Sequence, residues 1–385
     1  MPIYKADGKK DGLQKYNVRI NYMDGKGRAR QLTRTAYGLE AAKDLERKLA
    51  AEKKSDNGLR SRKMTVQELY EDYIDVKRYK VRESTLEKNV ATMQFYILPT
   101  LKEVRIDRLA AQHLQEWKTE MERRVTAKGA KLSLRTKQHA YDNLNAMLNY
   151  AVKMEYLPKN PLKIVGNFTD AAEIKKDMQY YTASEFTRFI AAATEIARDR
   201  ETRLGDQSEW DYCVFFCIAF YTGLRKGEIH SLKWSDISGP YLSVKRSVKQ
   251  VRIGEDRETP PKNKSSYRTL QMPLPLIKLL EDHKERQSML NGFSDDYRVC
   301  GGESYLRNNT INVRNRQYSE ASGQKRIRLH DFRHSHVSVL ANEGINIQEI
   351  ARRLGHSRIE MTWNTYSHLY PREEEKAVDV LNQIA

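Results

Sequence analysis

The chain has 385 residues, of which 39% are hydrophobic and 31% are charged, and its formal net charge at pH 7 is +17. This length predicts two or three domains, and the hydrophobic fraction is sufficient for packed cores. A positive excess of this size favours a polyanionic partner, of which the phosphate backbone of nucleic acid is the commonest. We predict no membrane span, because no apolar run approaches roughly 18 residues. The sequence also lacks a signal-peptide pattern, which predicts a cytoplasmic location.

The three cysteines indicate neither a disulfide framework nor a structural zinc site. Cys213 and Cys217 lie in or beside an apolar run at residues 214–220, which predicts buried thiols in a reducing compartment. The Cys-x-x-Cys pair that is typical of zinc sites does not occur in the sequence.

Residues 1–62 are predicted to form a small basic domain and a linker. Side chains alternate between polar and apolar at residues 16–22, which predicts a strand, and Asp24-Gly25 is typical of a hairpin turn before a second strand. Helical spacing follows over residues 39–51, and a polar linker over residues 53–62. A basic strand ribbon can enter a DNA major groove, although a sheet with one solvated basic face has the same pattern. The candidate DNA contacts are Arg19, Arg28, Arg30 and Arg34.

Residues 63–165 are predicted to form an all-helical domain. Capping boxes, in which Ser or Thr is followed three residues later by Glu, predict helix starts at Thr65 and Ser84. Further helices are expected over residues 111–121 and 135–154. A basic edge favours DNA contact, but a plain helical bundle would look the same, so this prediction depends on charge alone. The candidate residues are Arg135 and Lys137.

Residues 175–385 are predicted to form the largest domain. An apolar helix over residues 210–221 ends at Gly223, and glycine is the residue expected just past a helix end. Arg225 then opens the next helix, where amide donors and the helix dipole also favour an anion. An Arg on the surface beside a helix end is the alternative interpretation.

A β-hairpin is predicted next in the chain. Residues 244–251 and 267–271 have strand-forming side chains and can pair with each other. The loop between them contains Pro-Pro-Lys-Asn-Lys-Ser-Ser at residues 260–266, and it presents Lys262 and Lys264 at its tip.

The last quarter of the chain combines cations, imidazoles and one phenol. His330 and Arg333 are three residues apart, so on a helix they share one face and can grip one ligand. An Arg guanidinium matches phosphate oxygens with paired donors, and His transfers protons near neutral pH. Tyr366 follows, and a phenol becomes a nucleophile when its proton is removed or its oxyanion is stabilised. Together these groups indicate attack on a phosphodiester.

Two other interpretations of this region stay open. His330, His334 and His336 can suggest a metal site, but no carboxylate or thiolate cluster joins them at a useful spacing. Residues 347–358 also match a helix-turn-helix with Ala351 packed inside. That motif would make the chain a DNA-binding regulator without catalysis.

Taken in order, these residues make the chain resemble the tyrosine recombinases, and specifically the integrases of phages and conjugative transposons. Thr-Gly-Leu-Arg-Lys-Gly-Glu at residues 222–228 resembles the first-arginine motif of the family. His-Asp-Phe-Arg at residues 330–333 resembles its His-x-x-Arg motif, with Asp-Phe where x-Leu is common. Leu-Gly-His-Ser at residues 354–357 resembles the next motif, Tyr366 the nucleophile, and Lys262 the hairpin lysine.

The resemblance implies a reaction as well as a fold. Tyr366 would attack a DNA phosphodiester and form a 3′-phosphotyrosyl link. Arg225 and Arg333 would neutralise the charge on the phosphate, as a metal does in other enzymes. Lys262, or its rival Lys264, would donate a proton to the departing 5′-oxygen. The reaction exchanges like bonds, so neither a cofactor nor a metal is implied.

Three further residues have supporting roles in this resemblance. His330 would be the base or proton acceptor near Tyr366, and His356 would form a hydrogen bond to the phosphate. Glu228 would support Arg225 structurally. Residues 357–360 match a capping box and are expected to start the helix that runs towards Tyr366.

The resemblance also implies the architecture and the partners. The expected fold is a multidomain α+β protein with a three-stranded arm-binding domain at residues 1–62, a helical core-binding domain at 63–165, and a mainly α catalytic domain with a small antiparallel sheet at 175–385. The expected assembly is a homotetramer on double-stranded DNA with core and arm sites in a bacterial cell, assisted by an excisionase or a host DNA-bending protein. A helix over residues 373–384 would pack on a neighbouring subunit or on its own domain. A monomeric topoisomerase with the same chemistry is the alternative.

Overall fold

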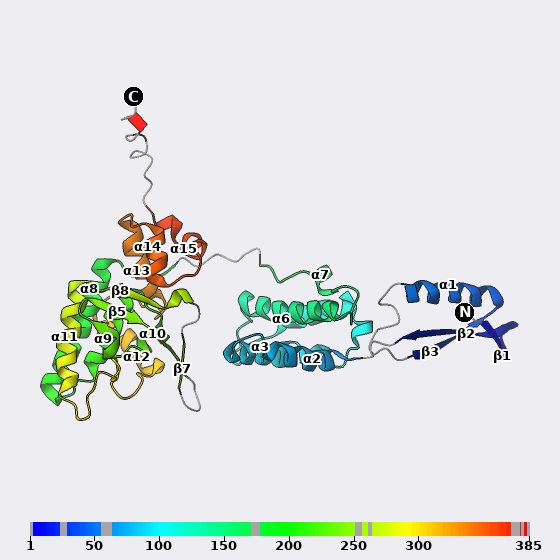
Figure 1. Cartoon of the computed structure of the whole chain (residues 1–385), viewed down its shortest axis with the longest axis horizontal. Coiled ribbons are helices and arrows are strands. Elements are labelled where there is room, and N and C mark those ends of the chain that lie inside the picture. The colour runs from blue at the N-terminus through cyan, green and yellow to red at the C-terminus, as the bar shows by residue number, and fades with distance from the viewer. Residues whose placement is uncertain are drawn as a thin grey trace. The chain divides into compact units, whose positions relative to one another are not determined.

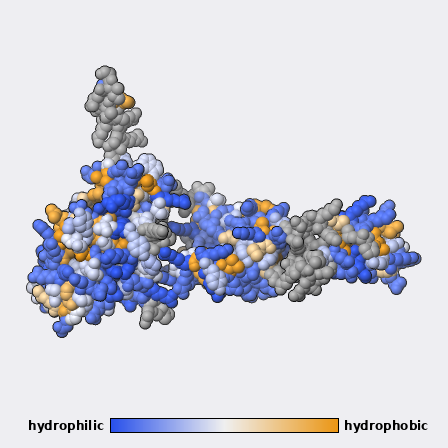
Figure 2. All heavy atoms as spheres, in the orientation of Figure 1, coloured by the Kyte–Doolittle hydropathy of each residue, from blue (hydrophilic) through white to orange (hydrophobic). Residues whose placement is uncertain are grey.

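The computed structural model describes residues 3–23, 29–54, 64–170, 178–250, 256–260, 264–370, 378 and 381–382 (Figure 1). The chain divides into two units, Met1–Ile174 and Lys175–Ala385. None of the described helices is long and apolar enough to span a membrane. Figure 2 shows hydrophilic residues over most of the visible face, which agrees with the high proportion of charged residues.

The N-terminal segment forms a three-stranded antiparallel sheet with one helix packed on it. Its elements are β1 (Ile3–Lys10), β2 (Leu13–Met23), β3 (Ala29–Tyr37) and α1 (Leu39–Lys54), and the strand order is β1-β2-β3. Because side chains alternate along β2, Val18 and Ile20 are buried while Arg19 between them is exposed. The predicted turn at Asp24 lies outside the described residues.

The helices that follow share a separate hydrophobic core. They are α2 (Val66–Arg78), α3 (Glu83–Tyr96), α4 (Leu98–Leu101), α5 (Ala111–Arg123), α6 (Leu134–Lys153) and α7 (Leu162–Val165). The capping box predicted at Thr65 is present, since the Glu68 amide donates to Thr65 Oγ1 at 3.2 Å and the Thr65 amide donates to the Glu68 carboxylate at 2.7 Å. The one predicted at Ser84 is wrong, because the helix already begins at Glu83 and Ser84 lies within its first turn.

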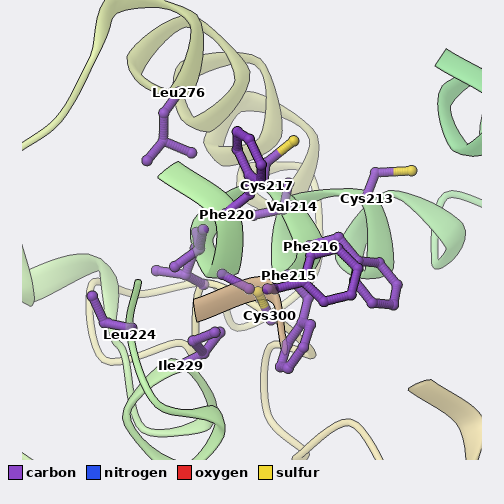
Figure 3. Packing of buried hydrophobic residues seen from close by; sticks show 14 of the residues in the cluster. Cys213, Val214, Phe215, Phe216, Cys217, Phe220, Leu224, Ile229, Leu276 and Cys300 are labelled. Atoms are coloured by element: carbon purple, nitrogen blue, oxygen red, sulfur yellow. The ribbon is translucent and has the colours of Figure 1, made fainter. Parts of the chain in front are cut away.

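Helix α9 (Glu209–Thr222) is the centre of the C-terminal unit. Most of its side chains are buried, and Figure 3 shows several of them in the surrounding core. Helices α8, α11 and α13 pack against α9. Cys213, Cys217 and Cys300 are free thiols in this core, and burial raises the pKa of each. The other helices of the unit are α8 (Ala183–Leu204), α10 (Lys226–His230), α11 (Leu274–Ser288), α12 (Asn308–Ala321), α13 (Asp331–Asn342), α14 (Ile347–Leu354) and α15 (Ile359–Tyr366).

Two small antiparallel sheets follow α10 in the chain. Their strands are β4 (Ile237–Ser238), β5 (Tyr241–Val244) and β8 (Arg268–Gln271) in the order β4-β5-β8, and β6 (Ser247–Lys249) paired with β7 (Arg257–Thr259). The predicted continuous strand over residues 244–251 is therefore wrong, because among the described residues of this range only Val244 pairs with β8, while residues 247–249 pair with β7. The strand breaks where Lys245 and Arg246 turn towards the buried carboxylate of Asp236, with which both form ion pairs.

Candidate active site

Arg333 joins three segments of the C-terminal unit. It lies in the first turn of α13 and is 3% exposed. Its Nη1 donates to the carbonyl of Gly223 at 2.6 Å. Its Nη2 donates to the carbonyl of Leu354 at 2.7 Å and to Nε2 of His356 at 2.9 Å. The guanidinium is therefore fixed between the loop that follows α9 and the loop that follows α14.

Two glycines allow these loops to approach the site. Gly223 and Gly355 end α9 and α14 with φ of +64° and +63°, a left-handed conformation that favours glycine. A Cβ on Gly223 would lie 2.7 Å from Cδ2 of His336. A Cβ on Gly355 would lie 3.0 Å from the carbonyl oxygen of Ser265. A side chain at either position would crowd these neighbours, and it would disturb the two loops whose carbonyl groups hold Arg333.

Arg225 and a second arginine, Arg268, share the carboxylate of Glu228. Arg225 precedes α10, and its amide and Nη1 donate to the two carboxylate oxygens at 2.9 and 3.0 Å. Arg268, from β8, is buried and donates to the same oxygens at 2.9 and 3.3 Å. Burial alone would raise the pKa of Glu228, but the charges and hydrogen bonds of Arg268 and Arg225 outweigh burial and lower that pKa. Glu228 is thus a fixed anion that orients a partly exposed Arg225.

His356 is held between Arg333 and Thr362. A guanidinium can only donate, so Nε2 of His356 accepts from Arg333, and Nδ1 carries the proton that is donated to Oγ1 of Thr362 at 2.8 Å. Burial, followed by the positive charges of Arg333 and Arg225, lowers the pKa of His356 to about 4. The ring is therefore neutral at pH 7.

Tyr366 ends α15 and is 3% exposed. Its ring packs in a small cluster that includes Val337 and Leu354. Its hydroxyl lies 2.6 Å from Nδ1 of His334, a residue of α13. Burial raises the pKa of Tyr366 to about 12, although the charge of Arg333 acts in the opposite direction. The phenol is therefore protonated at pH 7.

His330 contacts the ring of His334, which in turn contacts the phenol of Tyr366. Its ring makes an edge-to-face contact with His334, with centroids 5.0 Å apart. Among the described residues, the Tyr366 hydroxyl is hydrogen-bonded to His334 and not to His330. Partial burial and the charge of Arg333 lower the pKa of His330.

Five of the six predicted catalytic residues act on one another electrostatically. The charge of Arg225 contributes to the lowered pKa of Arg333, which falls to about 9 mainly through burial. The same charge contributes at His330 and His356, and the charge of Arg333 acts on Tyr366. The sixth residue, Lys262, lies outside the described residues, as does the side chain of its rival Lys264.

The predicted DNA-contacting residues differ in how they present their charge. Arg19 is exposed on β2 and Arg135 is exposed in the first turn of α6. Lys137 instead pairs with Glu122 at 2.5 Å, and its side chain is only 14% exposed. Arg28 and the side chain of Arg30 lie outside the described residues.

The site contains two residues that the sequence did not assign to it. Arg268 lies in a strand of ordinary composition, and its partner Glu228 is 40 residues away in the chain. The sequence suggests His334 only as a metal ligand, although its position four residues after His330 puts both rings on one helix face. Within the described part of the chain, no three His, Cys, Asp or Glu side chains are grouped as metal ligands.

Helices α14 and α15 are consecutive and are joined by a short turn that begins at Gly355, with Ala351 buried. The capping box predicted at Ser357 is wrong: α15 begins at Ile359, and the residue before it provides no side-chain cap. The helix predicted over residues 373–384 falls almost entirely outside the described residues.

Known protein families match both the helical domain and the C-terminal unit. The phage integrase family matches residues 179–373, and the phage integrase N-terminal SAM-like domain matches residues 65–121. The chain is 30% identical over 260 residues to the ICEBs1 integrase of Bacillus subtilis, a match that covers 66% of this chain and 67% of that protein. It is also 30% identical over 271 residues to a "Tyrosine recombinase XerC-like" protein of Caldanaerobacter subterraneus, covering 63% of this chain and 64% of the relative. The chain belongs to the phage integrase family of tyrosine recombinases, which confirms the family predicted from its motifs.

Solved structures show the same fold. The Tn1549 transposon integrase in complex with transposon right end DNA has a TM-score of 0.64 at 21% identity, covering 84% of this chain and 100% of that chain. A lambda integrase dimer bound to a COC′ core site has a TM-score of 0.54 at 17% identity, covering 93% of each chain. The predicted fold class is confirmed, with its N-terminal three-stranded sheet, helical SAM-like domain and mainly α C-terminal domain.

Proposed function

We propose that this chain is the site-specific recombinase of a mobile element, and that it cleaves and rejoins DNA through a 3′-phosphotyrosyl intermediate. The observation that carries the proposal is the position of Arg333. Its guanidinium is fixed by the Gly223 and Leu354 carbonyls, within electrostatic reach of Arg225 and of the phenol of Tyr366. Two preorganised cations beside a phenol form a site for phosphodiester attack.

In the cleavage step, Oη of Tyr366 forms a bond to the phosphorus and the bond from phosphorus to O5′ breaks. Lys262 is proposed to donate a proton to the departing O5′. A second 5′-hydroxyl then attacks the phosphotyrosine and releases Tyr366. The two steps exchange phosphodiester bonds of like energy, so the reaction requires no nucleotide cofactor.

Arg225 and Arg333 are proposed to bind the nonbridging oxygens, where negative charge increases in the transition state. Removal of one preorganised donor of this type typically costs roughly 3 to 4 kcal/mol, or on the order of 10²–10³ in rate. His356 is proposed to join them at the phosphate. Since its Nε2 accepts a hydrogen bond from Arg333, this role requires a proton on Nε2 before it can donate to a phosphate oxygen.

The remaining parts of the chain are proposed to bind the DNA. Residues 1–62 would bind arm sites and residues 63–165 core sites, with 175–385 as the catalytic domain. A lambda integrase tetramer has been solved on a Holliday junction, with a TM-score of 0.51 to this chain. That likeness supports the proposal of a homotetramer on two duplexes, with an excisionase or a host DNA-bending protein as accessory partners.

A nicked duplex tests the chemistry, because the short strand released by cleavage diffuses away and cannot be rejoined. The wild-type chain should form a complex that survives denaturation, and Tyr366→Phe should form none. Tyr370→Phe is the matched control, since that phenol lies four residues later and donates to the Ile345 carbonyl at 2.7 Å. An adduct that persists in Tyr366→Phe would assign the nucleophile elsewhere. A wild-type chain that binds DNA without any adduct would be a non-catalytic regulator.

The proposed arm domain has its own test. Deletion of residues 1–62 should flatten the dependence of log Kd on log salt by roughly 0.9 for each phosphate that the deleted residues neutralise. If the truncated chain relaxes supercoiled DNA as a monomer, and as fast as the full-length chain, that result would favour a topoisomerase instead.

A further inference from the structure

We infer that His334, rather than His330, takes the proton of Tyr366 when the phenol attacks the phosphodiester. This inference rests on the proposed function and assigns one of its proton transfers. It follows from position: Nδ1 of His334 lies 2.6 Å from the Tyr366 hydroxyl, the shortest route for the phenolic proton to any base of the described site.

The two residues approach each other from different elements. His334 lies in the first turn of α13, directly after Arg333, whereas Tyr366 is the last residue of α15. The phenol is held by apolar packing against Val337 and Leu354, so its hydroxyl has a fixed direction. The ring of His334 is tilted by 53° to the phenol with centroids 5.5 Å apart, which excludes ring stacking and leaves an in-plane nitrogen facing the hydroxyl.

The charges around His334 make it an acceptor. His330, Asp331, Arg328 and Arg333 act on its ring from its own helix and the residues before it, and the phenol faces it from α15. Burial, followed by the neighbouring His330, lowers the pKa of His334 to about 4, so the ring is neutral at pH 7. The inference assigns the tautomer in which Nδ1 of His334 carries the lone pair and accepts the phenolic hydrogen.

The transfer is coupled to bond formation. Before attack the proton stays on the phenol, because the pKa of Tyr366 is about 12 and that of His334 is about 4. As Oη bonds to phosphorus, the phenolic oxygen becomes more acidic and releases its proton more readily. The negative charge of the bound phosphodiester also counteracts the nearby arginine charges, which otherwise disfavour a protonated His334. One bond forms, from Oη to phosphorus, and one breaks, from phosphorus to O5′. The phenolic proton moves to Nδ1, and the proton on O5′ comes from Lys262.

His330 has a different position in this scheme. Its ring contacts the ring of His334 edge to face, and the residue is exposed just before the start of α13. His330 therefore packs against the imidazole that accepts the proton, and it is not hydrogen-bonded to the phenol. Truncation of His330 should slow cleavage less than truncation of His334.

The test is single-turnover adduct formation by the full-length chain on the nicked duplex, with His334→Ala, His334→Gln and His330→Ala compared with the wild type. Loss of a positioned base typically costs on the order of 10²–10⁴ in rate. His334→Ala and His334→Gln should both lose that factor with unchanged DNA affinity. Added imidazole should restore part of the rate to His334→Ala, because it can enter the space that the side chain leaves.

A second substrate separates the proposed base from the proposed acid. When sulfur replaces the bridging O5′, the leaving group departs without a proton, so Lys262→Ala should recover and His334→Ala should stay slow. A His334→Gln chain that cleaves at the wild-type rate would show that a hydrogen bond suffices, and the inference would be overturned. The same holds if His334→Ala cleaves at the wild-type rate, or if it is slow and imidazole has no effect. Absence of any adduct from the wild-type chain would refute the proposed function, and this inference with it.

Discussion

Replacement of Glu228 by glutamine should destabilise the C-terminal unit strongly, although the two side chains have the same shape. The carboxylate is buried, and it is the counter-ion of Arg268, whose side chain is only 4% exposed. In Glu228→Gln the Arg268 charge stays buried without an anion. Breaking a buried pair in this way typically costs about 3 to 5 kcal/mol. In a unit of this size, 1 kcal/mol shifts the melting temperature by roughly 2 to 4 °C, so the expected decrease is on the order of 10 °C.

The assay is calorimetric unfolding of the full chain, with the transition of the C-terminal unit as the readout. Glu349→Gln is the matched control, because Glu349 pairs with Arg352 on the surface, where the two side chains are 43% and 59% exposed. Such a pair is worth less than about 1 kcal/mol. A second change, Arg268→Met in the Glu228→Gln background, removes the buried charge and should recover much of the loss. A melting temperature for Glu228→Gln equal to that of the control would refute this reasoning.

The pH dependence gives an independent check on the same carboxylate. Its pKa in the folded chain is lowered from the usual 4.5, so the folded state favours the anion. The stability that Glu228 contributes is therefore complete above pH 4.5 and is lost as the pH falls through the lower folded-state pKa. The difference between the wild type and Glu228→Gln should shrink only in that acidic range.

Three further predictions concern a glycine, two buried thiols and one exposed arginine. Gly355→Ala should lower the melting temperature more than Gly205→Ala, because both glycines have φ near +64° but only the first would crowd its neighbours, as differential scanning calorimetry can measure. Cys217 and Cys300 should resist a thiol reagent in the native chain and react on unfolding, since burial raises the pKa of both thiols. Arg135→Ala should reduce the salt dependence of DNA binding by roughly 0.9 if the exposed guanidinium meets one phosphate, and an unchanged slope would remove it from the interface.

The elements that sequence predicted well are those whose signal is local. The apolar run of α9 predicted a buried helix, and the glycine after it predicted the left-handed helix end at Gly223. The capping box at Thr65 depends on residues three apart and was also correct. The capping boxes predicted at Ser84 and Ser357 are wrong because the helices begin elsewhere, at Glu83 and at Ile359.

The parts that sequence could not predict depend on tertiary packing. His330 precedes α13 and His334 lies in its first turn, with their rings in contact, and only the position of α15 decides which ring meets Tyr366. The residues next to Arg268 in the sequence do not indicate its role, because its partners are distant in the chain. It donates to Glu228 in α10, and its Nε donates to the Arg353 carbonyl at 2.6 Å. The family motifs predicted candidate residues for the site, but the pairing among the described ones required coordinates.

Besides burial, the charge balance of the site contributes to the lowered pKa values of the histidines, and it bears on the proposed reaction. Three guanidinium groups, those of Arg225, Arg268 and Arg333, face one carboxylate, that of Glu228, so two positive charges are unbalanced. That excess contributes to the low pKa values of the nearby histidines, because a further cation there is disfavoured. A phosphodiester carries one negative charge in its ground state and approaches two as the phenolic oxygen adds to phosphorus. In the proposed reaction, the fixed charges would therefore match the transition state better than the bound substrate, and only such a difference in binding accelerates the chemical step.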